Sequence, residues 1–317
     1  MTMHFRNIAE QAAADGAITP REIMGLRQAG WTSGDIDRQE AEALFAVNDR
    51  LLERSRQWSD FFVEALGEFI LNGAAPKGYV DDAQADWLIG RIDHNGKVDS
   101  MTELDLMVRL FERALNVPDR LREYALGQIE AAVLTGEGPT RCGGALKKGC
   151  VTEAEARLMR RIIFSSGSER PAAVSRKEAD MLYRIKDAAL GSASSPEWKR
   201  LFVQGVGNYL MGFAGQAPLS SERAAELESF MDDHRSSVGA FFGRMGKSAV
   251  KGKLFKGLRR HEKTVRAGNL AGRADQTREI DTSEKAWLKD RMDGNARIDE
   301  FDQALLDFIV EETGQAL

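Results

Sequence analysis

Apolar residues recur along most of the chain at spacings of three and four, which is the period of an amphipathic helix. Clear examples of a single apolar face lie at residues 58–70, 104–115 and 305–309. The alternation of apolar and polar residues that indicates strands is hard to find over more than a few positions. Only seven prolines interrupt the 317 residues. The pattern therefore predicts an all-α protein.

A short motif recurs at the expected helix starts. It consists of Ile or Val, then Thr, Ser or Asp, and a Glu or Gln three residues after that polar residue. In a capping box the short oxygen side chain accepts a hydrogen bond from a first-turn N–H, while the Glu or Gln accepts one from the N–H of the capping residue. The six clear copies place the capping residue at Thr19, Asp37, Asp81, Thr152, Ser175 and Asp281. We expect a helix to begin directly after each of them.

Paired copies of the motif divide the chain into repeats. Looser copies complete five pairs, which start at residues 18, 80, 151, 219 and 280. The sequence therefore predicts tandem helical units, about five in number and roughly 65 residues each. Residues 79–99 also match 279–299 at an offset of 200, and residues 58–67 match 198–207 at an offset of 140. Because the aliphatic residues of a pair flank one short helix, we expect them to form minimal two-residue antiparallel β-bridges.

The repeats set the expected domain organisation, and a chain of this length is expected to form more than one packing unit. The expected parts are residues 1–140 as units one and two, 141–236 as units three and four, 237–275 as a basic Gly-rich amphipathic linker, and 276–317 as a C-terminal helical half-unit.

Charge is distributed unevenly along the chain. The whole protein has a net charge of −5, which disfavours a nucleic-acid partner, yet residues 238–273 contain ten Lys or Arg and one acidic residue. Four interpretations of this basic segment are open: a solvated linker that neutralises acidic faces of the same chain, an amphipathic helix on anionic lipid, a contact with phosphate backbones, and a contact with an acidic partner. The residues expected to contact an anionic surface are Arg244, Lys247, Lys251, Lys253, Lys256, Arg259 and Arg260.

Two turns carry oxygen side chains at alternate positions, as metal-binding loops do. Residues 93–99 and 293–299 resemble the second half of an EF-hand loop, in which an Ile or Val is followed by a helix start. The resemblance implies calcium ligands among six side chains: Asp93, Asn95, Asp99, Asp293, Asn295 and Asp299.

The EF-hand resemblance also has two departures. With Val98 at position 8 of the loop, the first ligand position falls on Arg91, and in the second turn it falls on Arg291. A positive charge there opposes cation binding, and one helix rather than two separates each pair of motifs. A turn closed by Asp93 and Asn95, with Asp99 as a helix cap, explains the same residues without a metal. We therefore expect no cofactor, with a calcium sensor as the alternative function.

Residues 13–22, which read Ala-Ala-Asp-Gly-Ala-Ile-Thr-Pro-Arg-Glu, are similar to the opening signature of the TerB-like family of tellurite-resistance proteins. The family consists of small acidic helical proteins linked to metal binding and to complexes at the inner membrane. The resemblance implies a helical fold and one further metal ligand, Asp15.

Nucleophilic chemistry has little support in the sequence. Cys142 and Cys150 lack the CxxC spacing of zinc or redox sites, and two cysteines cannot build a disulfide framework. A reducing cytoplasm is the expected location, with peripheral contact to the inner membrane as a variant of it. The sequence thus predicts a non-enzymatic helical-repeat interaction or scaffold protein with an unidentified protein partner. An enzyme whose residues converge only in three dimensions is the remaining alternative.

Overall fold

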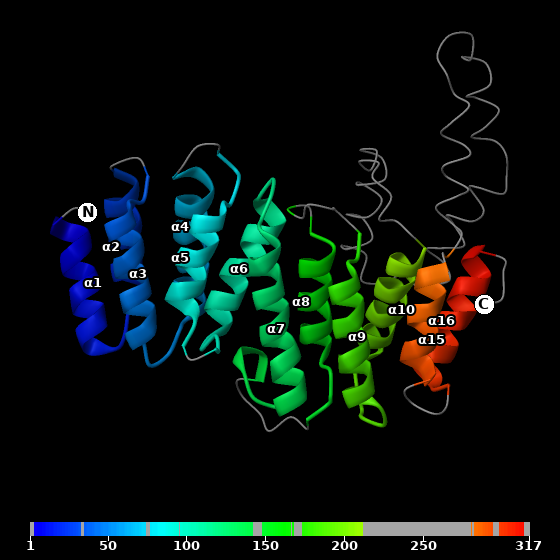
Figure 1. The fold of residues 1–317 in the computed structure, drawn as a ribbon. Coiled ribbons are helices and arrows are strands. Elements are labelled where there is room, and N and C mark those ends of the chain that lie inside the picture. Colours follow the sequence, from blue (N-terminus) through cyan, green and yellow to red (C-terminus); the bar gives the residue numbers. More distant parts are fainter. Residues whose placement is uncertain are drawn as a thin grey trace, which may run out of the picture. The chain divides into compact units, whose positions relative to one another are not determined.

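The computed structural model describes residues 3–32, 35–73, 77–94, 96–141, 148–165, 167, 173–211, 280, 282–293 and 298–313. The described part of the chain is mostly α-helical (Figure 1) and contains twelve α-helices, which confirms the predicted all-α class. In this part of the chain, no helix has both the length and the apolar character needed to cross a bilayer.

The chain divides into two compact units. Unit 1 comprises residues 1–148 and 165–171, and unit 2 comprises residues 149–164 and 172–317. The helices of unit 1 are α1 (Met3–Asp15), α2 (Pro20–Thr32), α3 (Arg38–Arg50), α4 (Arg56–Asn72), α5 (Asp82–Ile92), α6 (Met101–Arg113) and α7 (Asp119–Thr135), followed by the short 3-10 helix η1 (Pro139–Arg141). Those of unit 2 are α8 (Glu153–Ile163), α9 (Arg176–Ala189), α10 (Pro196–Leu210), α15 (Thr282–Asp293) and α16 (Glu300–Thr313).

The recurring motif starts helices as predicted. Reciprocal capping boxes precede α3, α5, α8 and α9. At α2, the backbone N–H of Thr19 donates to the Glu22 carboxylate at 2.8 Å, and the N–H of Glu22 donates to the Thr19 hydroxyl at 3.3 Å. The sixth predicted capping residue, Asp281, lies outside the described residues, as does the motif pair that starts at residues 219 and 238.

The helix that follows Val98 begins one residue later than predicted. Ser100, and not Asp99, is the N-cap of α6, because its hydroxyl accepts a hydrogen bond from the N–H of Glu103 and its own N–H donates to the Glu103 carboxylate. Three residues after Asp99 the chain has Thr102, so only Ser100 can complete a reciprocal box. The copy before α16 follows the prediction, since the Asp299 carboxylate accepts from the N–H of Asp302 at 3.0 Å.

The β-bridge found among the described residues differs from the expected one. Tyr79 pairs with Asn116 in parallel orientation, and the N–H of Val80 donates to the Asn116 carbonyl at 3.0 Å. The N–H of Val98 instead donates to the side-chain oxygen of Gln128 on α7. Val80 and Val98 therefore have different partners and do not pair with each other.

Each unit contains the same arrangement of five helices. In unit 1, α4 packs against α2, α3 and α6, and in unit 2, α10 packs against α8, α9 and α16. Helix α5 packs against this arrangement in unit 1 through Trp87, and α15 packs against it in unit 2 through Trp287. We call α2–α6 the five-helix core of unit 1, and α8, α9, α10, α15 and α16 the five-helix core of unit 2.

Edge-to-face ring contacts recur at equivalent positions of the two cores. Such pairs stabilise the packing beyond the area that they bury. The equivalent pairs, with their centroid distances, are Phe45–Phe62 (5.3 Å) and Tyr183–Phe202 (5.1 Å), Phe45–Trp87 (5.7 Å) and Tyr183–Trp287 (5.4 Å), and Phe69–Trp87 (5.4 Å) and Tyr209–Trp287 (4.8 Å). The offsets of 140 and 200 seen in the sequence thus relate residues that have the same contacts.

Candidate functional site

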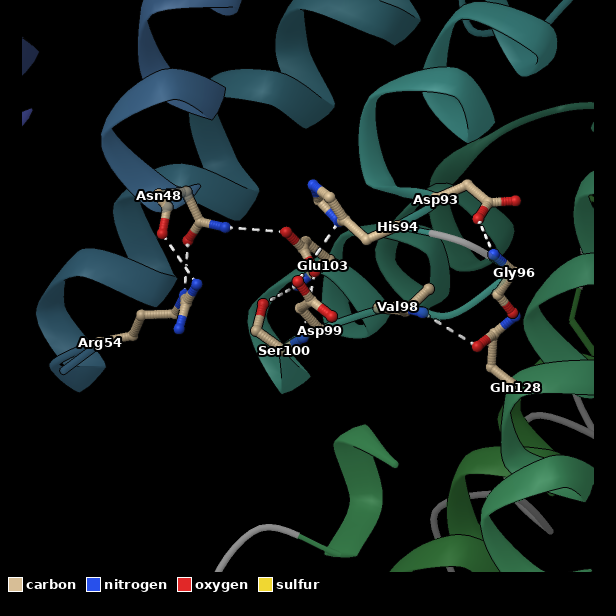
Figure 2. A network of polar contacts seen from close by, with 10 residues as sticks. All are labelled: Asn48, Arg54, Asp93, His94, Gly96, Val98, Asp99, Ser100, Glu103 and Gln128. Atoms are coloured by element: carbon tan, nitrogen blue, oxygen red, sulfur yellow. Dashed lines mark hydrogen bonds and ion pairs between the residues drawn. The ribbon is translucent and has the colours of Figure 1, made fainter. Parts of the chain in front are cut away.

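The turn between α5 and α6 contains three of the predicted calcium ligands, of which the structure describes Asp93 and Asp99 (Figure 2). The Asp93 carboxylate accepts a hydrogen bond from the N–H of Gly96, which has the positive φ of 84° that favours glycine. The Asp99 carboxylate is exposed and lies 3.5 Å from Nδ1 of His94. Asn95 lies outside the described residues, so its predicted role is not tested.

Helix α7 holds this turn in place through one buried amide. The side-chain oxygen of Gln128 accepts from the N–H of Val98 at 3.0 Å, and its amide nitrogen donates to the Gly96 carbonyl at 3.2 Å. Figure 2 shows Gln128 lying beside the turn. Val98 itself is only 2% exposed. One Asp93 oxygen and two backbone groups of the turn are therefore used to close and anchor it.

A buried polar cluster adjoins the turn. We call Asn48, Arg54, Trp58 and Glu103 the Asn48 cluster. The Asn48 amide nitrogen donates to the Glu103 carboxylate at 3.0 Å, and the Asn48 amide oxygen accepts from the indole N–H of Trp58 and from Nε of Arg54, both at 3.1 Å. Asn48 on α3 thus joins α4 to the first turn of α6.

Burial has the largest effect on the pKa values of the ionisable groups near this turn. It raises the pKa of Glu103, against the opposing effect of hydrogen bonds from Ser100 and of the charge on Arg54. Burial likewise raises the pKa of Asp49, although His94 and Arg91 act in the opposite direction. The pKa of Tyr124 is raised by burial and then by the charges of Asp93, Glu103 and Asp99. These negative charges therefore disfavour the ionised form of the Tyr124 hydroxyl.

In unit 2, Lys186 takes the place of Asn48 and binds two aspartates. We call Lys186, Asp299 and Asp302 the Lys186 cluster. Nζ of Lys186, on α9, lies 2.6 Å from the Asp299 carboxylate and 2.9 Å from that of Asp302. The Lys186 side chain is fully buried, as is that of Asp302. Asp299, a predicted calcium ligand, is therefore an N-cap residue and an ion-pair partner of Lys186.

The pKa values of the two aspartates in this cluster are shifted in opposite directions. Burial acts to raise the pKa of Asp299, but hydrogen bonds from Lys186 and from the backbone of Asp302 outweigh it and hold this pKa below its usual value. For Asp302 burial dominates, and its pKa is raised. Burial acts to lower the pKa of Lys186, but its bonds to both aspartates raise it above the ordinary value.

A third set of contacts is preserved in both units. In unit 1, the Glu42 carboxylate accepts from the indole N–H of Trp87 at 2.9 Å and pairs with Arg91. In unit 2, the Asp180 carboxylate accepts from the indole N–H of Trp287 at 2.8 Å and pairs with Arg291 at 2.6 Å. Arg91 and Arg291, which fall at the first ligand position of the EF-hand resemblance, thus bind carboxylates of a neighbouring helix.

Of the predicted metal ligands, the structure describes the side chains of Asp93 and Asp99 in the first turn and of Asp299 before α16. Within the described ranges, no three His, Cys, Asp or Glu side chains lie close enough together to hold a metal ion. Asn295, the Asp293 side chain and all seven predicted anionic-surface contacts lie outside those ranges, as does Cys142. The Cys150 thiol contacts the Ala193 carbonyl at 3.4 Å. Asp15 ends α1.

Sequence reasoning missed Asn48, Glu103 and Lys186, which form the centres of the two clusters. One signal was present, because a polar residue stands at an apolar-face position of its helix. Lys186 follows buried Leu182 and Tyr183 by four and three residues, and Asn48 follows buried Leu44 and Phe45 in the same way. The identity of the partners was not readable from this spacing.

Comparison of the chain with protein-family models, with curated proteins and with solved structures gives no match. The resemblances to EF-hand loops and to TerB-like proteins therefore rest on their short motifs alone.

Proposed function

We propose that this protein is a non-enzymatic helical-repeat scaffold that presents its folded units to protein partners. The observation that carries the proposal is the use of the buried polar groups in both cores. Asn48 and Lys186 bind carboxylates that cap helices, and Gln128 binds backbone groups of a turn. These contacts build and hold a frame, which is the role that a scaffold requires.

The finer architecture belongs to the same proposal. Tandem units of roughly 65 residues, about five in number, would arise by copying one ancestral segment of a long helix, a short helix and a further helix. The repeated order of α4, α5, α6 and of α10, α15, α16 supports this copying. Repeats of this kind offer extended surfaces between neighbouring units, which suit protein partners.

The basic segment, residues 238–273, is proposed as a second contact with an anionic membrane surface. Its charge is opposite to that of the rest of the chain, and near an anionic bilayer each Lys or Arg contributes about 1 kcal/mol. Seven neutralised charges should therefore abolish binding under conditions in which the wild type binds.

Vesicle sedimentation tests the membrane contact. The full chain should bind phosphatidylserine-containing vesicles, and should not bind pure phosphatidylcholine. Replacing the seven basic residues named above by Gln should remove the binding, whereas a control with exposed Lys285→Gln and Lys289→Gln on α15 should retain it. Equal binding by both variants would contradict the proposal.

Partner capture tests the scaffold itself. A pull-down from the native cell should retain the same protein partner with the full chain and with a chain that lacks residues 238–273, because the folded units are the proposed binding surface. Robust turnover in an unbiased substrate screen would contradict a non-enzymatic role.

A further inference from the structure

We propose that the Lys186 cluster selects the partner of the helix pair α15–α16, directing it to α9 and α10 and away from the similar surface of α3 and α4. The inference concerns how the two cores are kept apart, and it does not depend on the proposed function. It rests on four observations about the described residues.

The first observation is that packing shape alone discriminates poorly between the two surfaces. Trp87 of α5 meets Phe45 and Phe69, and Trp287 of α15 meets Tyr183 and Tyr209, in the same edge-to-face manner. A helix pair from one core would thus find aromatic rings in the matching places of the other. Proteins with similar tandem parts are prone to this kind of misassembly.

The second observation is the chain distance between each helix pair and the helix before it. Nine residues, 73–81, separate α4 from α5, but 71 residues, 211–281, separate α10 from α15. Bringing together segments that are further apart in the sequence costs more chain entropy during folding. The pair α15–α16 therefore needs a stronger chemical preference for its own surface than α5–α6 does.

The third observation is that the buried polar centre of the unit 2 interface is a lysine with two aspartates, although both interfaces also contain ion pairs nearer the surface, such as Arg113 with Glu68 in unit 1. Lys186 binds two carboxylates where Asn48 binds one, and Lys199 lies 3.2 Å from Glu300. At the position of Lys199 in unit 1, Ser59 makes a neutral hydroxyl contact with Thr102 at 2.7 Å.

On the wrong surface, α16 would place Asp299 and Asp302 against the neutral amide of Asn48. Two buried carboxylates without a matching cation are strongly unfavourable. Arg54, the nearest cation of that surface, already binds the Asn48 side chain and carbonyl.

The fourth observation is an unmet hydrogen bond that accompanies Lys186. Trp58 donates its indole N–H to Asn48, but the equivalent Trp198 finds no acceptor among the residues that the structure describes, because an ammonium group can only donate. Trp198 is fully buried. A buried donor without a partner is unfavourable, so the lysine is not the choice that best satisfies hydrogen bonds at this position. Selection of the correct helix pair accounts for its presence.

Among the described residues, α9, α10 and α15 each contribute groups near the cluster. On α9 they are Asp187, 3.5 Å from Lys186, and the Tyr183 ring, 5.2 Å away. Helix α10 contributes the uncharged Phe202, at 6.0 Å, and α15 contributes Arg291, which acts on Tyr183. No cation among these described groups could replace Lys186 without moving, because Arg291 is bound to Asp180.

The test transplants the unit 1 chemistry into unit 2. The variant combines Lys186→Asn, Asp299→Ser and Asp302→Glu in the full chain, so that both surfaces offer the same polar groups. A carbodiimide reports correct docking, because it can join the Lys199 amine and the Glu300 carboxylate as an amide while it takes up the released water as a urea. This cross-link is read by mass spectrometry, and circular dichroism reports the helix content.

For the wild type we expect the Lys199–Glu300 cross-link as the main product from Glu300. For the transplanted variant we expect unchanged helix content and at least a severalfold loss of this cross-link, together with new contacts of α16 with unit 1 or with a second molecule. A matched control, Lys285→Asn with Lys289→Asn, should leave the cross-link unchanged.

Two results would overturn the proposal. Retention of the cross-link at the wild-type level would show that the cluster does not select the partner. Loss of helix content from unit 2 without any new contact would show that the cluster only stabilises the unit. A reciprocal variant, with Asn48→Lys, Ser100→Asp and Glu103→Asp, offers α16 a second matching surface, and the cross-link should fall there too.

Discussion

The cores of units 1 and 2 are built alike around different polar centres. Asn48 in unit 1 satisfies a carboxylate and an indole at once, whereas Lys186 in unit 2 pairs two carboxylates and leaves the Trp198 indole without an acceptor among the described residues. Apolar and aromatic packing therefore sets the shape of the five-helix core. The polar centre can change while this shape stays the same.

The two cores also differ in the outer faces of their helices. In unit 1, α7 covers α5 and α6, and Val98 is 2% exposed, whereas the equivalent Ile298 is 60% exposed. The buried Ala85, Leu104 and Val108 of unit 1 correspond to exposed positions in unit 2, which are Lys285, Gln303 and Asp307. The outer face of the described part of unit 2 is therefore more polar than that of unit 1.

Removing the lysine should give the largest effect and sharpen this comparison. Lys186→Met leaves Asp299 and Asp302 buried without their cation, and breaking a buried pair in this way costs about 3–5 kcal/mol. Hydrogen exchange of α9, α10 and α16 should accelerate accordingly, while exchange of α3, α4 and α6 should not change. The exposed Lys285→Met is the control and should have little effect.

A smaller effect is expected from removing the amide in unit 1. Asn48→Ala leaves a Glu103 oxygen and the Trp58 N–H without partners, and each unsatisfied buried group costs about 1–3 kcal/mol. Faster exchange should appear in α3, α4 and α6. If α16 responded equally, the two centres would not belong to separate cores.

The next smaller effect on stability is expected from a matched pair of tryptophan substitutions, at Trp58 and at Trp198. Trp58→Phe and Trp198→Phe lose the same ring volume, but only the first loses a hydrogen bond, which contributes about 1 kcal/mol. Urea unfolding should therefore show the greater destabilisation for Trp58→Phe. Equal losses would contradict the difference between the two centres.

Acid should affect the contributions of Glu103 in unit 1 and of Asp299 in unit 2 with opposite sign. Because the pKa of Glu103 is raised on folding, its contribution to stability is present below the unfolded pKa and is lost as pH rises through the folded value. The pKa of Asp299 is lowered, so its contribution is present above the unfolded pKa and is lost as pH falls through the folded value.

Two variants test this difference of sign. The wild type should lose stability relative to Glu103→Gln as pH rises above the ordinary glutamate pKa, because the pKa of Glu103 is raised on folding. Relative to Asp299→Asn, the wild type should instead gain stability as pH rises through the range just below the ordinary aspartate pKa. Melting temperatures across these ranges measure both, and slopes of the same sign would contradict the assignment.

Calcium should have the smallest effect. The Asp93 carboxylate is used to close the turn, and Arg91 and Arg291 stand where the sequence resemblance to EF-hand loops would place the first ligands. Titration with millimolar calcium should therefore produce no binding heat and no shift in melting temperature. A clear shift that is lost in Asp93→Asn would favour the sensor alternative.

Local features of the fold were readable from the sequence, but the polar centres were not. The boxes at Asp37 and Ser175 follow from four consecutive residues, because a capping box is a local structure. Asn48 and Glu103 are 55 residues apart, and Lys186 and Asp302 are 116 apart, so their pairing depends on the tertiary packing of whole helices. The cap was predicted at Asp99 but lies at Ser100, because a reciprocal box also needs an acidic or amide side chain three residues after the cap, and only Ser100 has one.

The indole N–H spectrum of the ¹⁵N-labelled chain tests most directly whether the two cores are copies. The account predicts that Glu42→Ala shifts the Trp87 signal and leaves Trp287 in place, and that Asp180→Ala does the reverse, with shifts of similar size. A spectrum in which either substitution leaves its own tryptophan unmoved would contradict the account, since that core would then lack the contact that defines the other.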